Sequence, residues 1–276
     1  MKKLFFYISF LMIFIDIKKA QAFPEMIRHH YVNCIACHES PSGGGLLNGY
    51  GRTISAEVLS TWGNTNEARP FYGTLDHQFF KKWFNIGGNL RALQLKTENS
   101  QMKRAMFIRM QTGVESSIKM GNLKLVAFFG KQEQGNMVRG EFTRFYSIYQ
   151  LTDELTLRAG RFIPNFGLNI AEHTLATRKG LGFDEGSERD QVELMWGGEK
   201  WNSSLTLSKQ INTRNSNTLE KAASFQVNYN FLDSYRVGAD LWLGDRLGKK
   251  RQIIGGHAVL GFSEKIYYLT EFNLQK

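Results

Sequence analysis

The sequence predicts an all-β protein, namely an antiparallel up-and-down transmembrane β-barrel of about 10–12 strands behind a small irregular or helical N-terminal segment. From Phe79 onward, segments of 10 to 14 residues alternate apolar and polar side chains between Gly, Asn, Asp or charged turns. No apolar stretch after Ile15 is long enough for a spanning helix, so a membrane protein of this kind would cross with strands. The 21 Phe, 10 Tyr and 5 Trp recur near the expected strand ends, as in aromatic girdles.

Residues 1–22 have the pattern of a secretory signal peptide. Two lysines follow the first methionine, residues 4–15 form an apolar run of 12 residues, and Ala20-Gln21-Ala22 supplies the small residues of a cleavage site. The run is too short to span a bilayer, and the charges at positions 16, 18 and 19 disfavour an N-terminal membrane anchor. We therefore expect an exported protein located in the outer membrane.

The chain is basic, with a formal net charge of +10. The expected signal peptide holds four lysines and one aspartate, so about +7 belongs to the mature chain. A basic surface suits nucleic acid, acidic lipid headgroups or anionic solutes. Export disfavours nucleic acid, which leaves acidic lipid headgroups and anionic solutes, and we expect outer-membrane lipid to be a partner.

Both cysteines of the chain lie in Cys34-Ile35-Ala36-Cys37-His38, a C-x-x-C-H arrangement. This is the covalent attachment pattern of c-type haem, because thiols at this spacing can add to the two vinyl groups of a porphyrin. His38 would then bind the haem iron from one face. We expect one covalent haem c on Cys34 and Cys37. A disulfide, a redox dithiol and a zinc site are the alternatives, although zinc lacks a second cysteine pair.

Residues 23–78 form the expected haem-binding segment, and residues 79–276 the expected barrel. Three glycines at 43–45 predict irregular backbone, and residues 48–52 predict a tight turn. Residues 54–62 predict a short helix that ends at Gly63.

One block of this segment has a recognisable pattern: Tyr31-x-x-Cys34-x-x-Cys37-His38-x-Ser40-Pro41-x-Gly43-Gly44-Gly45-x-Leu47-x-x-Tyr50-Gly51-Arg52. It resembles the N-terminal segment of exported, outer-membrane-barrel-like proteins of Gram-negative bacteria that carry one c-type haem motif. The resemblance covers about 30 residues and implies a haem-bearing plug or arm on a barrel. It implies no particular reaction.

The second axial ligand of the iron is left open by the sequence. His, Met or solvent can fill this position. The candidates are Met26, His29 and His30 upstream of the motif, His77 at the barrel entrance, and His173 in a long loop. Among these we favour His30, because imidazole is a common ligand in low-potential electron transfer.

The alternation is clearest in residues 221–232, which precede a short hairpin turn at Leu232-Asp233-Ser234. One side carries Ala223, Phe225, Val227, Tyr229 and Phe231, and the other carries Ala222, Ser224, Gln226, Asn228 and Asn230. Similar segments lie near 83–96, 102–116, 120–131, 139–151, 153–163, 188–197, 200–211, 235–243, 250–262 and 266–274. These make about eleven strands, although bacterial outer-membrane barrels usually have an even number. A soluble β-sandwich with an aromatic core is the alternative.

One long connection reaches from Arg158 to about Glu188. Its start, Gly160-Arg161-Phe162-x-Pro164-x-Phe166-Gly167, resembles a strand-to-loop turn of phosphate-selective-type porins. Such a loop can fold into the barrel and set what passes, or it can be an ordinary extracellular loop. Its polar and charged residues include Asn169, Glu172, His173, Thr174, Arg178 and Lys179.

Two functions are consistent with these patterns. The first is electron transfer between the periplasm and the outer membrane or cell exterior, with periplasmic c-type cytochromes as partners. The second is an anion-preferring porin whose N-terminal segment is a structural plug, held by a disulfide or a structural haem. No nucleophile motif, carboxylate pair or phosphate loop predicts an enzyme, which leaves only peroxidase-like chemistry at an open haem.

Overall fold

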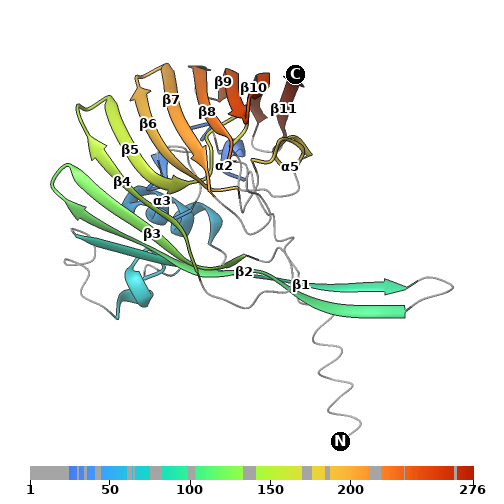
Figure 1. The fold of residues 1–276 in the computed structure, drawn as a ribbon. Helices are drawn as coiled ribbons and strands as arrows, with labels where there is room; N and C mark the ends of the chain where they lie inside the picture. Colours follow the sequence, from blue (N-terminus) through green and yellow to red (C-terminus); the bar gives the residue numbers. More distant parts are fainter. Residues whose placement is uncertain are drawn as a thin grey trace, which may run out of the picture.

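The structure is a computed structural model that describes residues 25–29, 31–33, 36–40, 45–60, 64, 66–74, 83–98, 103–132, 141–169, 176–183, 187–211, 219–232, 234–263 and 266–276. Within these residues, eleven strands form one antiparallel sheet in which each strand pairs with its neighbours in the sequence (Figure 1). The strands are β1 (Phe84–Glu98), β2 (Lys103–Met120), β3 (Leu123–Gln132), β4 (Glu141–Gln150), β5 (Leu155–Phe162), β6 (Arg189–Gly197), β7 (Trp201–Gln210), β8 (Lys221–Phe231), β9 (Tyr235–Arg246), β10 (Lys249–Ser263) and β11 (Ile266–Gln275).

The predicted all-β, up-and-down arrangement of strands is confirmed. Each of the eleven alternating segments is a strand, and β8 and β9 form the hairpin expected around residues 232–234. The described strands belong to a single sheet, so the alternative of two packed sheets is wrong. The sheet is not closed within the described residues, because β1 pairs only with β2 and β11 only with β10.

The two faces of the sheet have opposite polarity. On β8, the side chains of Ser224, Gln226 and Asn228 are buried, whereas Phe225 is exposed. The same alternation of buried polar and exposed apolar positions continues through β6 and β7. We call the buried, polar side the inner face and the exposed, apolar side the outer face. On β6–β8 this polarity is the reverse of a water-soluble sheet, whose apolar side chains would be the buried ones, whereas the inner face of β3, β4, β9 and β10 also buries apolar side chains.

The two ends of the strands also differ. One rim, here called the short-turn rim, carries the brief connections after β2, β4, β6, β8 and β10. Aromatic residues gather there, namely Trp83, Tyr149, Trp196, Trp201, Tyr229, Phe231, Tyr235 and Tyr268. The opposite rim, here called the long-loop rim, carries the connections after β3, β5 and β7. Not every tyrosine lies at a rim: Tyr146 of β4 is buried on the inner face against Phe162.

The N-terminal segment lies on the inner side of the curved sheet (Figure 1). It contains α2 (Glu25–Arg28), α3 (Gly49–Ile54), the π-helical turn η2 (Ser55–Leu59) and the 3-10 turn η3 (Pro70–Gly73). The predicted helix over 54–62 therefore begins earlier than expected, and the predicted tight turn at 48–52 is wrong. Asn48 caps α3 by accepting a hydrogen bond from the Gly51 amide at 2.8 Å. Residues 61–63 lie outside the described part.

The long connection after β5 folds onto the inner face of the sheet and is not an ordinary external loop. Gly167 donates its amide to Asp240 Oδ1 on β9 at 2.9 Å, and Asn165 Nδ2 donates to Ser204 Oγ on β7 at 3.0 Å. Leu168 donates its amide to Glu271 Oε2 on β11 at 3.1 Å. The connection continues into α5 (Ala176–Leu181), whose Arg178 is buried. Glu172, His173 and Thr174 lie outside the described residues.

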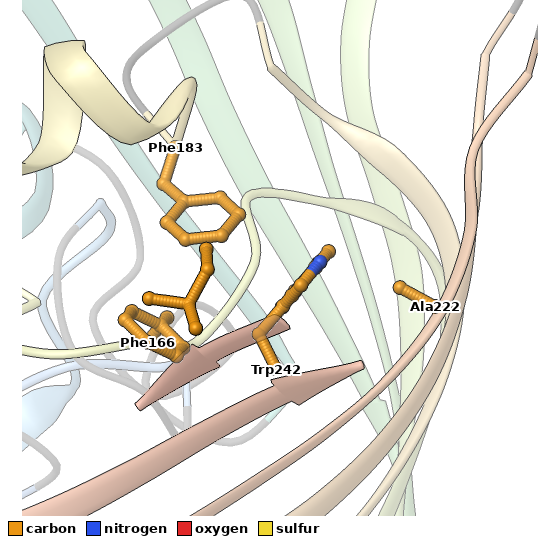
Figure 2. Packing of buried hydrophobic residues seen from close by; sticks show 5 residues of the cluster. Phe166, Phe183, Ala222 and Trp242 are labelled. Carbon is orange, nitrogen blue, oxygen red and sulfur yellow. The ribbon is translucent and has the colours of Figure 1, made fainter. Parts of the chain in front are cut away.

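An aromatic cluster fills the space between this connection and strands β8–β10 (Figure 2). Phe166 and Phe183 pack against each other and against Trp242, with ring centroids 4.6 to 6.3 Å apart. Ala222 and Ile253 complete the cluster. Trp242 is fully buried, and its Nε1 atom donates to Glu220 Oε1 at 3.2 Å. This half of the inner face is therefore filled by the chain's own side chains.

Candidate cofactor site

The candidate site is formed where the cysteine motif meets the inner face of β1 and β2. His38 forms a bridge with Leu47, which turns the chain back on itself after the motif. Asn48 Nδ2 then donates to the carbonyls of Ala36 at 2.9 Å and of His38 at 3.4 Å. The backbone on both sides of Cys37 is thereby fixed by a single asparagine side chain.

The ring of His38 is oriented by a backbone carbonyl. Its Nδ1 atom lies 3.2 Å from the oxygen of Gly45, and it donates in the tautomer that carries a proton at Nδ1. In that tautomer the lone pair is on Nε2. A histidine that binds a metal commonly donates its other ring nitrogen to a carbonyl in this way. The arrangement therefore suits His38 as an iron ligand.

Two glycines allow the N-terminal segment to pack closely against strand β2 and against the cysteine motif. Gly45 has φ +66°, and a Cβ there would lie 2.6 Å from Glu115 Oε2. Gly51 is buried in α3, and a Cβ there would lie 2.2 Å from the carbonyl oxygen of Cys37. Helix α3 can therefore approach the motif only because position 51 has no side chain.

A cavity of about 550 Å³ opens beside His38. Its apolar walls include Leu46, Leu59 and Ile86, and its polar groups include Arg52 and Glu115. Cavities of this size and composition bind cofactors and other small ligands. One carboxylate oxygen of Glu115, a residue that is 3 % exposed, has no hydrogen-bond partner among the described residues.

Arg52 places a positive charge at this cavity. Its Nη2 atom donates to Asn85 Oδ1 and to the carbonyl of Ile86, both on β1. Burial lowers the pKa of Arg52, and the nearby carboxylate of Glu39 acts in the opposite direction. An arginine that is half-buried beside a cavity is suited to the carboxylates of a bound group.

The rest of the motif is tied to the sheet by charged and polar contacts. Glu39 accepts from Lys124 Nζ on β3 and from Asn85 Nδ2, the latter at 2.9 Å. Ser40 accepts from Arg158 Nη1 on β5 at 2.9 Å, and Arg158 forms a fully buried ion pair with Glu193 at 2.6 Å. The segment is thus attached across β1, β3 and β5.

The two tyrosines of the block are also in contact. The hydroxyls of Tyr31 and Tyr50 lie 2.7 Å apart, and their ring centroids 6.2 Å apart. This hydrogen bond raises the pKa of Tyr50 above its ordinary value. The pair links the chain before the motif to the helix after it.

The structure describes only some of the predicted site residues. His38 lines the cavity, whereas Cys37 packs against Gly51 of α3 and does not line it. Cys34 lies outside the described residues, as do His30, His77 and His173. Met26 and His29 do not line the cavity. Helix α2 instead packs against β10 and β11, where Ile27 contacts Val259. The second axial ligand stays a prediction.

Arg52, Glu115 and the Gly45 carbonyl were missed as site groups. The pattern Asn48-x-x-Gly51 is a helix-start signal that could have located α3 and hence Arg52. No local signal marks Glu115, because it lies far along the sequence on a strand. No helix among the described residues is long and apolar enough to cross a membrane. The sequence matches no protein-family model and no curated protein.

Proposed function

We propose that this chain is an outer-membrane β-barrel whose N-terminal segment carries one covalent c-type haem and takes part in electron transfer. The observation that carries the haem assignment is His38 Nδ1 facing the Gly45 carbonyl, directly after Cys37 and beside a 550 Å³ cavity. The resemblance of the Tyr31–Arg52 block to haem-bearing, barrel-like proteins of Gram-negative bacteria supports it. The expected partners are periplasmic c-type cytochromes.

The side chains of the motif and of the cavity beside it suit a haem. Cys37 and Cys34 would form the thioethers, His38 would bind the iron through Nε2, and Arg52 would pair with a propionate. The haem, when bound, supplies reversible one-electron transfer. The chain's own residues orient His38, exclude water with Leu46, Leu59 and Ile86, and hold a cation at Arg52. One haem cannot bridge a membrane core about 30 Å thick, so a partner is required.

Membrane insertion is supported by the exposed apolar outer face. Large side chains on that face include Leu194, Leu205, Leu207, Phe225 and Ile254, each at least 40 % exposed. Strand β8 has 11 residues from Lys221 to Phe231. At about 3.4 Å per residue and a tilt of about 40°, this corresponds to a height of roughly 29 Å, enough to cover a barrel's apolar band of about 25 Å.

Closure of the barrel belongs to the same proposal. Because eleven antiparallel strands leave β1 and β11 running in the same direction, direct closure would need one parallel pair. Lipid does not tolerate unpaired strand edges, so β1 and β11 must be paired with each other or with a further strand.

The deciding experiment expresses the full chain with a c-type maturation system and stains a denaturing gel for haem. A pyridine haemochrome spectrum then distinguishes two thioether bonds from one. We expect covalent haem in the wild type, its loss or weakening in Cys37→Ala, and an altered ligand-field spectrum in His38→Ala with haem still attached. A wild type without covalent haem would overturn the assignment and favour the plugged, anion-preferring porin.

The porin alternative makes its own prediction, which is anion-preferring conductance in planar bilayers. This alternative rests on the mature net charge of about +7 and on the basic long loop with Arg178 and Lys179. The guanidinium of Arg178, however, donates to the carbonyls of Phe183 at 2.7 Å and Phe166 at 3.4 Å. A buried arginine that holds a loop together is poorly placed to select permeating anions, so electron transfer is the better-supported function.

A further inference from the structure

Six charged residues form a continuous row across the outer face near the long-loop rim. Each is the direct cross-strand neighbour of the next, from β5 to β10: Arg161, Asp190, Lys209, Lys221, Asp245 and Lys250. Opposite charges face each other at every step but one. The exception is Lys209 opposite Lys221, at the middle of the row.

No ion pair within the described residues includes either lysine, although Asp190 and Asp245 are their other cross-strand neighbours, and the six charges of the row sum to +2. Ion pairs there join Arg161 to Asp190 at 3.0 Å and Glu220 to Arg189 at 2.5 Å, but none includes Lys209 or Lys221. Residues directly opposed in an antiparallel sheet have Cβ atoms about 4.5–5.5 Å apart, and like charges at that distance are destabilising. An anion between the two ammonium groups would replace this repulsion with attraction.

An apolar hollow adjoins the two lysines. The next outward residues toward the short-turn rim are Val192, Leu207, Ala223 and Leu243, which are again direct cross-strand neighbours. They and the lysines line a wide, shallow surface hollow of about 920 Å³, whose lining also includes Asp190 and Asp245. The site therefore has a cationic end and a hydrocarbon floor, which is the complement of a lipid.

We propose that this hollow binds one lipid through a phosphate headgroup held between Lys209 and Lys221, with an acyl chain lying over Leu207, Ala223 and Leu243. The inference rests on the proposed membrane location. Asp190 and Asp245 flank the lysines on either side, so the row accepts one anionic group at its centre and repels a second. Lipid-facing basic residues near a headgroup region attract anionic lipids.

The test uses the full haem-loaded chain in a neutral detergent, with native mass spectrometry to count retained lipids. The probes are phosphatidylglycerol and phosphatidylcholine with identical acyl chains, so that only headgroup charge differs. The test variant is Lys209→Gln/Lys221→Gln. The matched control is Arg246→Gln/Lys249→Gln, because those residues are also directly opposed cations at the same rim but belong to the inner-facing series.

We expect the wild type and the control to retain one phosphatidylglycerol with a preference of roughly tenfold over phosphatidylcholine, and the test variant to lose that preference. An unchanged preference in the test variant would overturn the proposal. Displacement of the retained lipid by millimolar inorganic phosphate would also overturn it, because the site would then bind a free anion.

Flotation of the wild type with lipid vesicles separates this proposal from the proposed function. A chain that floats and carries haem but shows no headgroup preference contradicts the lipid site alone. A chain that does not float contradicts membrane insertion and the lipid site together.

Discussion

The two halves of the inner face are covered in different ways. Strands β1–β5 are covered by the N-terminal segment through polar contacts, such as those of Glu39 with Lys124 and Ser40 with Arg158. Strands β7–β11 are covered mainly by the chain that follows β5, whose Phe166 and Phe183 pack on Trp242, and at β10 and β11 also by α2. The first half keeps a cavity beside His38, and the second half is filled with aromatic rings. On the proposed function, the cavity of the first half would hold the haem.

The largest expected loss of stability comes from the aromatic cluster around Trp242, which fills the second half of the inner face. Trp242→Ala removes a fully buried indole and should lower the free energy of unfolding by about 3–5 kcal/mol. Chemical denaturation of the detergent-solubilised protein, followed by far-UV circular dichroism, measures this loss. The matched control is Trp201→Ala on the outer face, which is 49 % exposed and stacks on Tyr229, and it should cost about 1 kcal/mol. Equal losses for the two variants would show that Trp242 is not tightly packed in a buried cluster.

Arg158 lies between the two halves and couples the segment to the sheet. Arg158→Met leaves the fully buried carboxylate of Glu193 without its cation and should cost about 3 kcal/mol. Limited proteolysis should also cut the N-terminal segment faster, because Ser40 loses its donor. The double variant Arg158→Met/Glu193→Gln should recover most of the stability but not the protection of the segment. Recovery of both would show that the contact with Ser40 contributes little.

Two glycines of the same short helix give the sharpest test of the half that holds the cavity. Gly51→Ala places a methyl group 2.2 Å from the Cys37 carbonyl, whereas Gly49→Ala meets no atom within 4 Å. Gly51→Ala should cost about 1–3 kcal/mol and reduce the yield of covalent haem severalfold. Gly49→Ala should leave both quantities unchanged or slightly improved. Haem staining normalised to protein measures the yield, and equal yields would refute close packing of α3 on the motif.

The smallest expected effect concerns the ion pair between Lys124 and Glu39. Lys124→Gln should cost about 1 kcal/mol or less, because Lys124 is partly exposed and Glu39 keeps its hydrogen bond from Asn85. The loss should shrink further at high salt, since screening weakens such pairs. Denaturation midpoints at low and high ionic strength measure it. A loss as large as that of Arg158→Met would contradict the ranking of the two contacts.

The strands could be predicted from the sequence because side-chain alternation has a period of two along each strand. Residues 221–232 show this most plainly, and the pattern also separated Phe225 from Ser224 onto opposite faces. Alternation alone does not say which face is buried, since that depends on the solvent around the sheet. The contacts of Ser40 with Arg158 join residues 118 positions apart, and no local pattern records such pairs.

The cysteine motif was the one part of the site visible in the sequence, because its chemistry requires a fixed spacing. Helix α3 was misjudged as a turn because Gly49 and Gly51 are poor helix formers. The structure explains Gly51 by the nearby Cys37 carbonyl, a constraint that acts across the fold. Glu115 could not be predicted as a site residue, since its role depends on how far the segment penetrates the inner face.

The position of the motif on the inner face has a consequence for biogenesis. Enzymes that attach haem must reach both thiols of an extended peptide, yet the folded segment is bound through Asn48, Glu39 and Ser40 and faces strands β1–β5. On the proposed function, haem ligation would therefore precede the last stage of folding. The order of events would be export, then attachment of haem to the leading peptide, then wrapping of the strands around it. A cell without the attachment enzymes would then produce a chain whose N-terminal segment lacks the group around which it packs.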